Sequence, residues 1–223
     1  MTFSVEVFDR DDYGGEAAAR IGAALPGEGE VVITGGGTAA DIYPILARVA
    51  PDWSRLDVYF SDERCVPPND DRSNFAMARR LLLDEVGPRS LHRMRGEDPP
   101  EDAAALYGLD VEQVVAGDGF GLALLGMGAD AHVGALFPGS PALEVTVFCA
   151  AVDRPDGLRG LTLTPPALLS SREVLLLVTG GAKAEAVRRV VRGDEAPASC
   201  PAGLLSDHPN ATFLLDEPAA SRL

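Results

Sequence analysis

Short, uninterrupted runs of valine, isoleucine and leucine recur along this chain, and they constrain its fold more than any other feature. Several of these runs lack the polar alternation of a strand with one face in water. They are typical of strands that are covered by helices on both faces. The sequence predicts strands over residues 30–34, 56–60, 120–125, 145–152, 161–164, 174–179 and 212–215.

Segments with helical periodicity lie between the predicted strands. They cover residues 14–24, 38–49, 73–86, 101–116 and 182–192. Ser73 or Asp71 is suited to cap the third of these helices. Because strands alternate with helices, we expect an α/β fold, Rossmann-like, with a mostly parallel central sheet and helices on both faces. No repeat or low-complexity linker divides the 223 residues, so we expect one domain over 1–223.

Composition limits the possible partners. The net charge of −15 argues against nucleic acid, and an anionic substrate would need a locally basic pocket. No apolar run approaches the roughly 20 residues of a membrane helix, and the opening residues MTFSVEVFDRDD do not resemble a secretory signal. The three cysteines suggest neither a metal site nor a disulfide pattern. We therefore expect a cytoplasmic protein that contacts no membrane.

Four of the predicted strands lead directly into loops that are rich in glycine and charged residues. These loops cover residues 34–38, 61–64, 126–132 and 179–183. In a parallel α/β sheet the carboxyl ends of the strands share one edge, and ligands bind there. We therefore expect the residues of these four loops to gather around one site.

The first loop, Thr34-Gly35-Gly36-Gly37-Thr38, opens a predicted helix. Its glycines allow backbone N–H groups to approach an anion, and the positive end of the helix dipole favours negative charge there. The loop matches neither the dinucleotide-binding GxGxxG pattern nor a Walker loop. A tight structural turn is the alternative interpretation.

The other three loops carry side chains suited to chemistry. A histidine can accept a proton from water, and Asp130 is placed to orient His132. Arg64, in the segment 62–64, can clamp a phosphate or carboxylate through two parallel hydrogen bonds. Lys183, the only lysine, lies at a predicted helix start, where a cation is unfavourable and an anionic ligand is indicated. A structural histidine, a surface salt bridge and a solvated lysine are the respective alternatives.

Together these segments resemble the 6-phosphogluconolactonase family, in the variety with the sugar-phosphate isomerase/deaminase fold and not the β-propeller variety. The resemblance runs from about residue 30 to 220, in the family's order and spacing. The matching pieces are TGGGT at 34–38, DERCVP at 62–67, SN at 73–74, LLGMGADAH at 124–132, LFPG at 136–139, LTLT at 161–164, TGGAK at 179–183 and PAS at 197–199.

The resemblance implies hydrolysis of 6-phospho-D-glucono-1,5-lactone to 6-phosphogluconate, in the pentose phosphate pathway, without a metal or a cofactor. His132 would be the general base, oriented by Asp130, and Arg64 would lie across the sugar ring. Backbone N–H groups of residues 126–132 would stabilise the oxyanion. The residues that bind the substrate and its phosphate would be Thr34, Gly35, Gly36, Gly37, Thr38, Asp62, Arg159 and Lys183.

The chain departs from the family pattern at four positions. Ala131 stands where the family has the glycine of Asp-Gly-His, and alanine there would cost roughly 1 kcal/mol if the backbone needs a positive φ. Ala135 replaces a serine, and Leu169 replaces an asparagine. The family's arginine before LTLT aligns with Gly160, and Arg159 lies one residue earlier, which in an extended segment points to the opposite face.

Two alternatives stay open from the sequence. An amino-sugar-phosphate deaminase or aldose–ketose isomerase shares the fold and the TGG loop, but such enzymes typically have Asp-Glu-Tyr at 62–64 and Asn-Glu-Pro at 136–138. A non-catalytic sugar-phosphate-binding protein would fit the departures at positions 131, 135 and 160. We expect a small-molecule phosphosugar lactone as the partner, and a monomer is slightly favoured.

Overall fold

The computed structural model of the protein describes residues 4–223. The first three residues of the opening segment MTFSVEVFDRDD, which does not resemble a secretory signal, therefore lie outside the described residues. A seven-stranded sheet forms its centre, in the order β1-β10-β9-β6-β2-β3-β5, and all the pairings are parallel. The strands are β1 (Ser4–Phe8), β2 (Gly29–Ile33), β3 (Leu56–Phe60), β5 (Ser90–His92), β6 (Leu122–Gly126), β9 (Val174–Val178) and β10 (Ala211–Asp216). The predicted fold class is confirmed.

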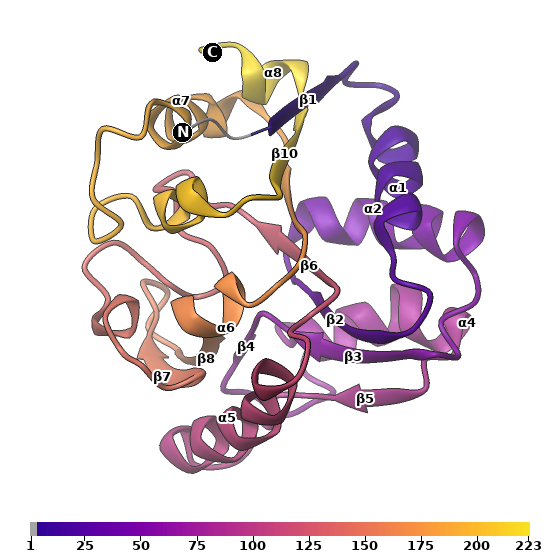
Figure 1. Ribbon diagram of the computed structural model, residues 1–223, viewed down its shortest axis with the longest axis vertical. Helices are drawn as coiled ribbons and strands as arrows, with labels where there is room; N and C mark the ends of the chain where they lie inside the picture. The colour runs from indigo at the N-terminus through magenta and orange to yellow at the C-terminus, as the bar shows by residue number, and fades with distance from the viewer. Residues whose placement is uncertain (1–3) are drawn as a thin grey trace.

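Helices cover both faces of this sheet, with α1, α2 and α4 on one side of Figure 1 and α6 and α7 on the other. The α-helices are α1 (Tyr13–Ala24), α2 (Gly37–Val49), α3 (Asn74–Ala78), α4 (Asp84–Val86), α5 (Pro100–Ala116), α6 (Pro165–Leu169), α7 (Ala184–Arg192) and α8 (Glu217–Ala220). Neighbouring residues of β2 pack into different cores, Val31 and Ile33 with α1 and α2, and Val32 on the opposite face. The strands therefore lack polar alternation because both of their faces are buried.

A second, antiparallel sheet begins at the carboxyl end of β3. Its strands are β4 (Asp62–Arg64), β8 (Arg159–Leu163) and β7 (Cys149–Asp153), in the order β4-β8-β7. The Ser61 carbonyl, between β3 and β4, accepts a hydrogen bond from the Leu163 N–H at 2.8 Å. This small sheet places the segment 62–64 and the β7–β8 hairpin next to the edge where the parallel strands end.

The structure corrects several predicted boundaries. Residues 62–64, predicted as a loop, form β4, and the strand predicted from 145 begins only at Cys149. The helix predicted over 73–86 contains a π-helical turn at Arg79–Leu83. The predicted helix 182–192 starts as a 3₁₀ turn at Gly181–Lys183. Strands β1 and β5 were not predicted, because both lie at sheet edges and neither carries a continuous apolar run.

The remaining 3₁₀ turns are η2 (Pro141–Leu143) and η4 (Pro201–Asp207). Within residues 4–223, none of the helices combines the length and the apolar character needed to cross a bilayer.

Candidate active site

The carboxyl ends of β2, β3, β6 and β9 meet around one cavity of about 440 Å³. Each of the four loops identified in the sequence contributes to its wall, as the parallel arrangement of the strands requires. Of the predicted site residues, all except Asp130 and Arg159 line this cavity. The lining residues are Thr34, Gly35, Gly36, Gly37, Thr38, Ala39, Asp41, Asp62, Arg64, Asn74, Gly126, Met127, Gly128, His132, Gly134, Arg154, Leu177, Thr179 and Lys183.

The glycine loop presents an uncapped helix end to the cavity. Gly36 has a φ of 96°, a conformation that favours glycine, and α2 begins at the next residue without a side-chain cap. The first N–H groups of a helix have no partner within it, so those of residues 37–39 can bind an anion. Tyr43 holds the loop, because its hydroxyl donates to the Thr34 carbonyl (2.6 Å) and accepts from the Thr34 N–H (3.1 Å).

Glu63 organises the neighbouring wall from a buried position. Its carboxylate accepts hydrogen bonds at 2.7–2.8 Å from the N–H groups of Arg64, Asn74 and Phe75 and from the Ser73 hydroxyl. Burial raises the pKa of Glu63 although these hydrogen bonds act in the opposite direction. Glu63 does not line the cavity, so it acts by fixing the start of α3 against β4.

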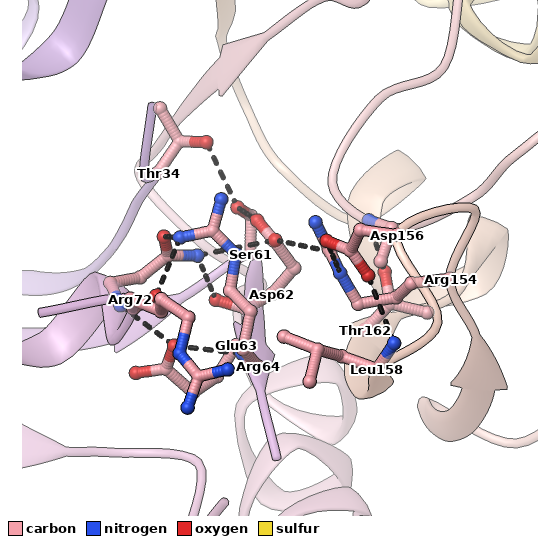
Figure 2. A network of polar contacts seen from close by, with 12 residues as sticks. Thr34, Ser61, Asp62, Glu63, Arg64, Arg72, Arg154, Asp156, Leu158 and Thr162 are labelled. Atoms are coloured by element: carbon pink, nitrogen blue, oxygen red, sulfur yellow. Dashed lines mark hydrogen bonds and ion pairs between the residues drawn. The ribbon is translucent and has the colours of Figure 1, made fainter. Parts of the chain in front are cut away.

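Asn74 connects two side chains of the cavity wall. Its side-chain oxygen accepts from Nη1 of Arg64 at 2.6 Å, and its side-chain nitrogen donates to the Asp62 carbonyl (2.8 Å) and carboxylate (3.2 Å). A side chain at Gly35 would overlap the Asn74 carboxamide, which explains the glycine there. Figure 2 shows the network around Arg64, in which the Arg72 carbonyl is a second acceptor for Nη1. No acidic side chain of the described residues pairs with Arg64, so its other N–H groups are available to a ligand.

His132 and Asp130 form a hydrogen-bonded pair in the loop after β6. Nδ1 of His132 lies 2.6 Å from Oδ1 of Asp130. Burial opposes ionisation of Asp130, but the charge and hydrogen bonds of His132 outweigh it and lower the pKa of Asp130. An ionised carboxylate only accepts hydrogen bonds, so Nδ1 carries a proton, and in the neutral imidazole Nε2 is then free to act as a base. A Cβ at Gly128 would overlap the imidazole, so this position requires glycine.

The turn between Asp130 and His132 is left-handed. Ala131 has a φ of 68°, and among residues 4–223 it is the only non-glycine residue with a positive φ. It is also fully buried. The condition under which alanine is costly at this position, a positive φ, is therefore met, and alanine adopts that conformation at a cost of roughly 1 kcal/mol.

Part of the predicted oxyanion-binding backbone is already engaged. The Gly128 N–H donates to the His132 carbonyl, and the Ala131 N–H donates to the Gly128 carbonyl. The His132 N–H donates to the Asp130 carboxylate at 3.2 Å. These three N–H groups are not available to an oxyanion, which leaves only the other N–H groups of residues 126–132 for that role.

Lys183 lines the cavity from the turn between β9 and α7. Although the chain has 34 acidic residues, none of those in the described part of the chain forms an ion pair with Lys183. Thr179, in the same loop, joins this side of the cavity to the glycine loop, because its hydroxyl lies 2.8 Å from that of Thr38. An unpaired cation beside an uncapped helix end fits an anionic ligand.

The structure does not bring Arg159 to the cavity. Its guanidinium pairs with Glu101 (2.7 Å) and Asp153 (3.1 Å), and its side chain is 42% exposed. This placement agrees with the reversed direction of a side chain shifted by one residue in an extended strand. Arg154 lines the cavity instead, and it was not predicted, because the surrounding Asp, Pro and Gly residues are typical of a surface loop.

Comparisons with known proteins cover almost the whole chain. The family model of glucosamine-6-phosphate isomerases/6-phosphogluconolactonase matches residues 13–214. A curated 6-phosphogluconolactonase of Mycobacterium tuberculosis is 40% identical over 250 residues, covering 100% of this chain and 99% of that protein. One of Streptomyces coelicolor is 35% identical, covering 96% of this chain and 92% of that protein.

Solved structures share the fold. The 6-phosphogluconolactonase of Thermotoga maritima has a TM-score of 0.84 at 26% identity, covering 96% of this chain and 99% of that one. A monomeric glucosamine-6-phosphate deaminase has a TM-score of 0.86 at 23% identity, covering 99% of this chain and 100% of that one. At such low identity the second likeness shows the fold alone.

Proposed function

The chain belongs to the family of glucosamine-6-phosphate isomerases and 6-phosphogluconolactonases, and from this premise we propose that it is a 6-phosphogluconolactonase. It hydrolyses 6-phospho-D-glucono-1,5-lactone to 6-phosphogluconate, a step of the pentose phosphate pathway. One observation carries the proposal: a single cavity holds a histidine paired with an aspartate, two cations that form no ion pair within residues 4–223, and an uncapped helix end. Curated relatives that are named as lactonases support it at 35–40% identity.

The α2 end of the cavity suits the phosphate group of the substrate. The free N–H groups of residues 37–39 and the Thr38 hydroxyl can donate hydrogen bonds to phosphate oxygens. Lys183 lines the same cavity and supplies a positive charge that attracts the phosphate. Because the whole protein carries a net charge of −15, such a local group of donors is needed to hold a dianion.

His132 acts as the general base on a water molecule. Nε2 takes a proton as the water oxygen adds to C1 of the lactone, and the Asp130 carboxylate stabilises the imidazolium that forms. The bond between C1 and the ring oxygen then breaks. The ring oxygen takes the proton from His132 and becomes the C5 hydroxyl, which leaves a carboxylic acid at C1 that then releases its proton to water and becomes the carboxylate. None of these reaction steps uses a metal ion or a cofactor.

Arg64 and Asp62 bind the sugar on the opposite wall. Asn74 holds Nη1 of Arg64, so the free part of the guanidinium is positioned to bind ring oxygens or the carboxylate that develops. Asp62 lines the same wall and can accept a hydrogen bond from a sugar hydroxyl. Both residues belong to β4, so one short strand provides the two contacts.

The proposal is tested by measuring lactone hydrolysis with freshly generated substrate and subtracting spontaneous hydrolysis. We expect turnover by the wild type, and we expect His132→Ala to lower kcat by about 10²–10⁴, the contribution of a positioned general base. His208→Ala is a matched control, because His208 hydrogen-bonds the Ser171 carbonyl outside the cavity. A His132→Ala variant with near wild-type kcat would contradict the assignment of the base.

The same preparation separates the alternatives. Release of ammonia from glucosamine 6-phosphate would indicate a deaminase, and we expect none. Binding of 6-phosphogluconate without lactone turnover would indicate a binding protein. We further propose a cytoplasmic location, since the three cysteines are unpaired, which suits a reducing compartment. A monomer is the oligomeric state that we propose alongside it. Light scattering coupled to size exclusion tests the monomer.

A further inference from the structure

Arg154 lies in the cavity wall although its neighbours in the chain face solvent. It directly follows β7, in a turn closed by a hydrogen bond from its N–H to the Leu158 carbonyl at 3.0 Å. The side chains of Asp153 and Asp156 are 92% and 49% exposed, whereas that of Arg154 is only 10% exposed. A guanidinium this buried requires partners, because an unpaired buried charge is costly.

The acidic neighbours of Arg154 leave most of its donors free. Nε donates to the Asp156 carboxylate at 3.2 Å. Nη1 lies 3.8 Å from the Asp62 carboxylate, which is an ion pair but beyond hydrogen-bond distance (Figure 2). Neither terminal nitrogen donates a hydrogen bond to any acceptor in the part of the chain that the structure describes. Arg154 therefore offers the planar pair of donors that binds a phosphate or carboxylate through parallel hydrogen bonds.

Gly160 provides the space for this side chain. A Cβ at position 160 would lie 2.9 Å from Cδ and 3.2 Å from Cγ of Arg154, so any side chain there would displace the arginine. The guanidinium carbon also lies 5.5 Å from the ring centroid of Phe137, whose ring is 4.6 Å from that of His132. The space at Gly160 and the aromatic face of Phe137 thus position Arg154, and neither contact uses its hydrogen-bond donors.

We propose that Arg154 binds the anionic ligand of the cavity directly, and that Gly160 is the position that admits it. The identity of the ligand, a phosphorylated sugar acid, rests on the proposed function. Arg154 has the chemistry for either anionic group of that ligand, the phosphate or the carboxylate. In the ligand-bound cavity the anion accepts hydrogen bonds from the Arg154 guanidinium. The Asp62 carboxylate forms an ion pair with this group but lies too far away to accept a hydrogen bond from it.

The test is isothermal titration calorimetry with 6-phosphogluconate. Arg154→Ala should weaken binding roughly 10- to 150-fold, the loss of hydrogen bonds to a charged group. Arg154→Lys should lie between this variant and the wild type, because lysine keeps the charge and the stem but not the planar fork. Arg159→Ala is the matched control, since this arginine of the same hairpin pairs outside the cavity, and we expect no change. Thermal melts of each variant establish that it is folded.

A second ligand, D-glucitol 6-phosphate, lacks the carboxylate and identifies the group that Arg154 binds. Losses for both ligands support a phosphate contact, and a loss for 6-phosphogluconate alone supports a carboxylate contact. If Arg154→Ala and Arg154→Lys bind both ligands as the wild type does, the proposal is overturned. A fall in kcat with unchanged affinity also overturns it, because Arg154 would then act only through Phe137 and His132.

The double variant R154A/G160R tests the role of Gly160. A side chain at position 160 starts toward the space that Arg154 vacates, so we expect the double variant to recover part of the lost affinity. A folded double variant that binds no better than Arg154→Ala contradicts the role given to Gly160. A wild-type protein that neither hydrolyses the lactone nor binds 6-phosphogluconate would overturn the proposed function. Normal wild-type activity with unaffected Arg154 variants would overturn this inference alone.

Discussion

At the scale of the residue, the turn between Asp130 and His132 is strained, because Ala131 carries a methyl group where the backbone has a positive φ. Its φ of 68° costs an alanine roughly 1 kcal/mol. We therefore expect Ala131→Gly to raise the free energy of unfolding by at most about 0.5 kcal/mol, since glycine relieves this strain but gains freedom in the unfolded chain. Urea unfolding followed by circular dichroism measures the change.

Ala135 provides the matched control for this change. It is fully buried in the same loop, but its φ is not positive. Ala135→Gly should therefore lower the free energy of unfolding by roughly 0.5–1 kcal/mol. If Ala131→Gly were also less stable than the wild type, packing of the Ala131 methyl group would outweigh the backbone strain.

Lys183 and Arg159 were predicted together as phosphate ligands, and their surroundings now distinguish them. Lys183 lines the cavity without an acidic partner, whereas Arg159 pairs with Glu101 and Asp153. Lys183→Ala should weaken 6-phosphogluconate binding by about 1.5–3 kcal/mol, the range for hydrogen bonds to a charged group. Arg159→Ala should leave the affinity unchanged, because this arginine pairs outside the cavity, and calorimetry compares the two variants. An unchanged affinity in Lys183→Ala would mean that this lysine is a solvated surface residue that does not bind the ligand.

The sequence allowed the positions of His132, Arg64 and Lys183 to be predicted, because each follows a buried strand of a parallel sheet. It did not allow the position of Arg154 to be predicted. The direction of that side chain depends on the space at Gly160 and on the ring of Phe137. The contact with Gly160 is made only when β7 and β8 have paired, and the contact with Phe137 only when this hairpin packs against the loop after β6.

At the scale of the element, Glu63 joins β4 to α3. Glu63→Gln replaces an acceptor-only carboxylate by an amide whose NH₂ group would face N–H donors. It should therefore lower the free energy of unfolding by about 1–3 kcal/mol. It should also weaken ligand binding, because Asn74 would no longer fix Arg64. Denaturant unfolding and calorimetry measure the two effects.

Ser73→Ala is the control for Glu63→Gln. It removes one hydrogen bond to Glu63 and the cap of α3, in which the Ser73 hydroxyl accepts from the Ala76 N–H, and it should cost about 1 kcal/mol. It should leave ligand affinity nearly unchanged, since the N–H groups of Asn74 and Phe75 still bind Glu63. Equal stability of Glu63→Gln and the wild type would mean that the amide reorients without loss.

The same elements show where the sequence was sufficient and where it was not. Ser73 or Asp71 was predicted as the cap of this helix from its residue type, and in the structure the cap is Ser73. The π-helical turn at Arg79–Leu83 and the strand β4 were not predicted. A three-residue polar strand has no periodicity to recognise, and β4 forms because the Gly160 segment of β8 pairs with it across nearly 100 residues of sequence.

At the scale of the whole molecule, one sheet supports two cores and the site. Continuous apolar runs predicted a parallel sheet, and a parallel sheet places its carboxyl ends together, so the position of the cavity followed from the fold. Trp53 is buried in the core beneath α1 and α2, and Cys149 and Cys200 are buried in the core on the opposite face. That the chain folds as one domain over 1–223 remains a prediction, and these side chains can test it.

Because β2 and β9 contribute side chains to both cores, neither core can unfold without disrupting the sheet that supports the other. We therefore expect one cooperative transition in guanidinium, with the same midpoint for Trp53 fluorescence and for the reactivity of the buried thiols. The experiment uses Cys65→Ser, because Cys65 is partly exposed and would react in the folded state. Product at 100 times its Kd should raise both midpoints together, adding roughly 2.7 kcal/mol of stability. If thiol exposure preceded the fluorescence change, or if product shifted only one midpoint, the two faces would be independent folding units and the single-domain prediction would be wrong.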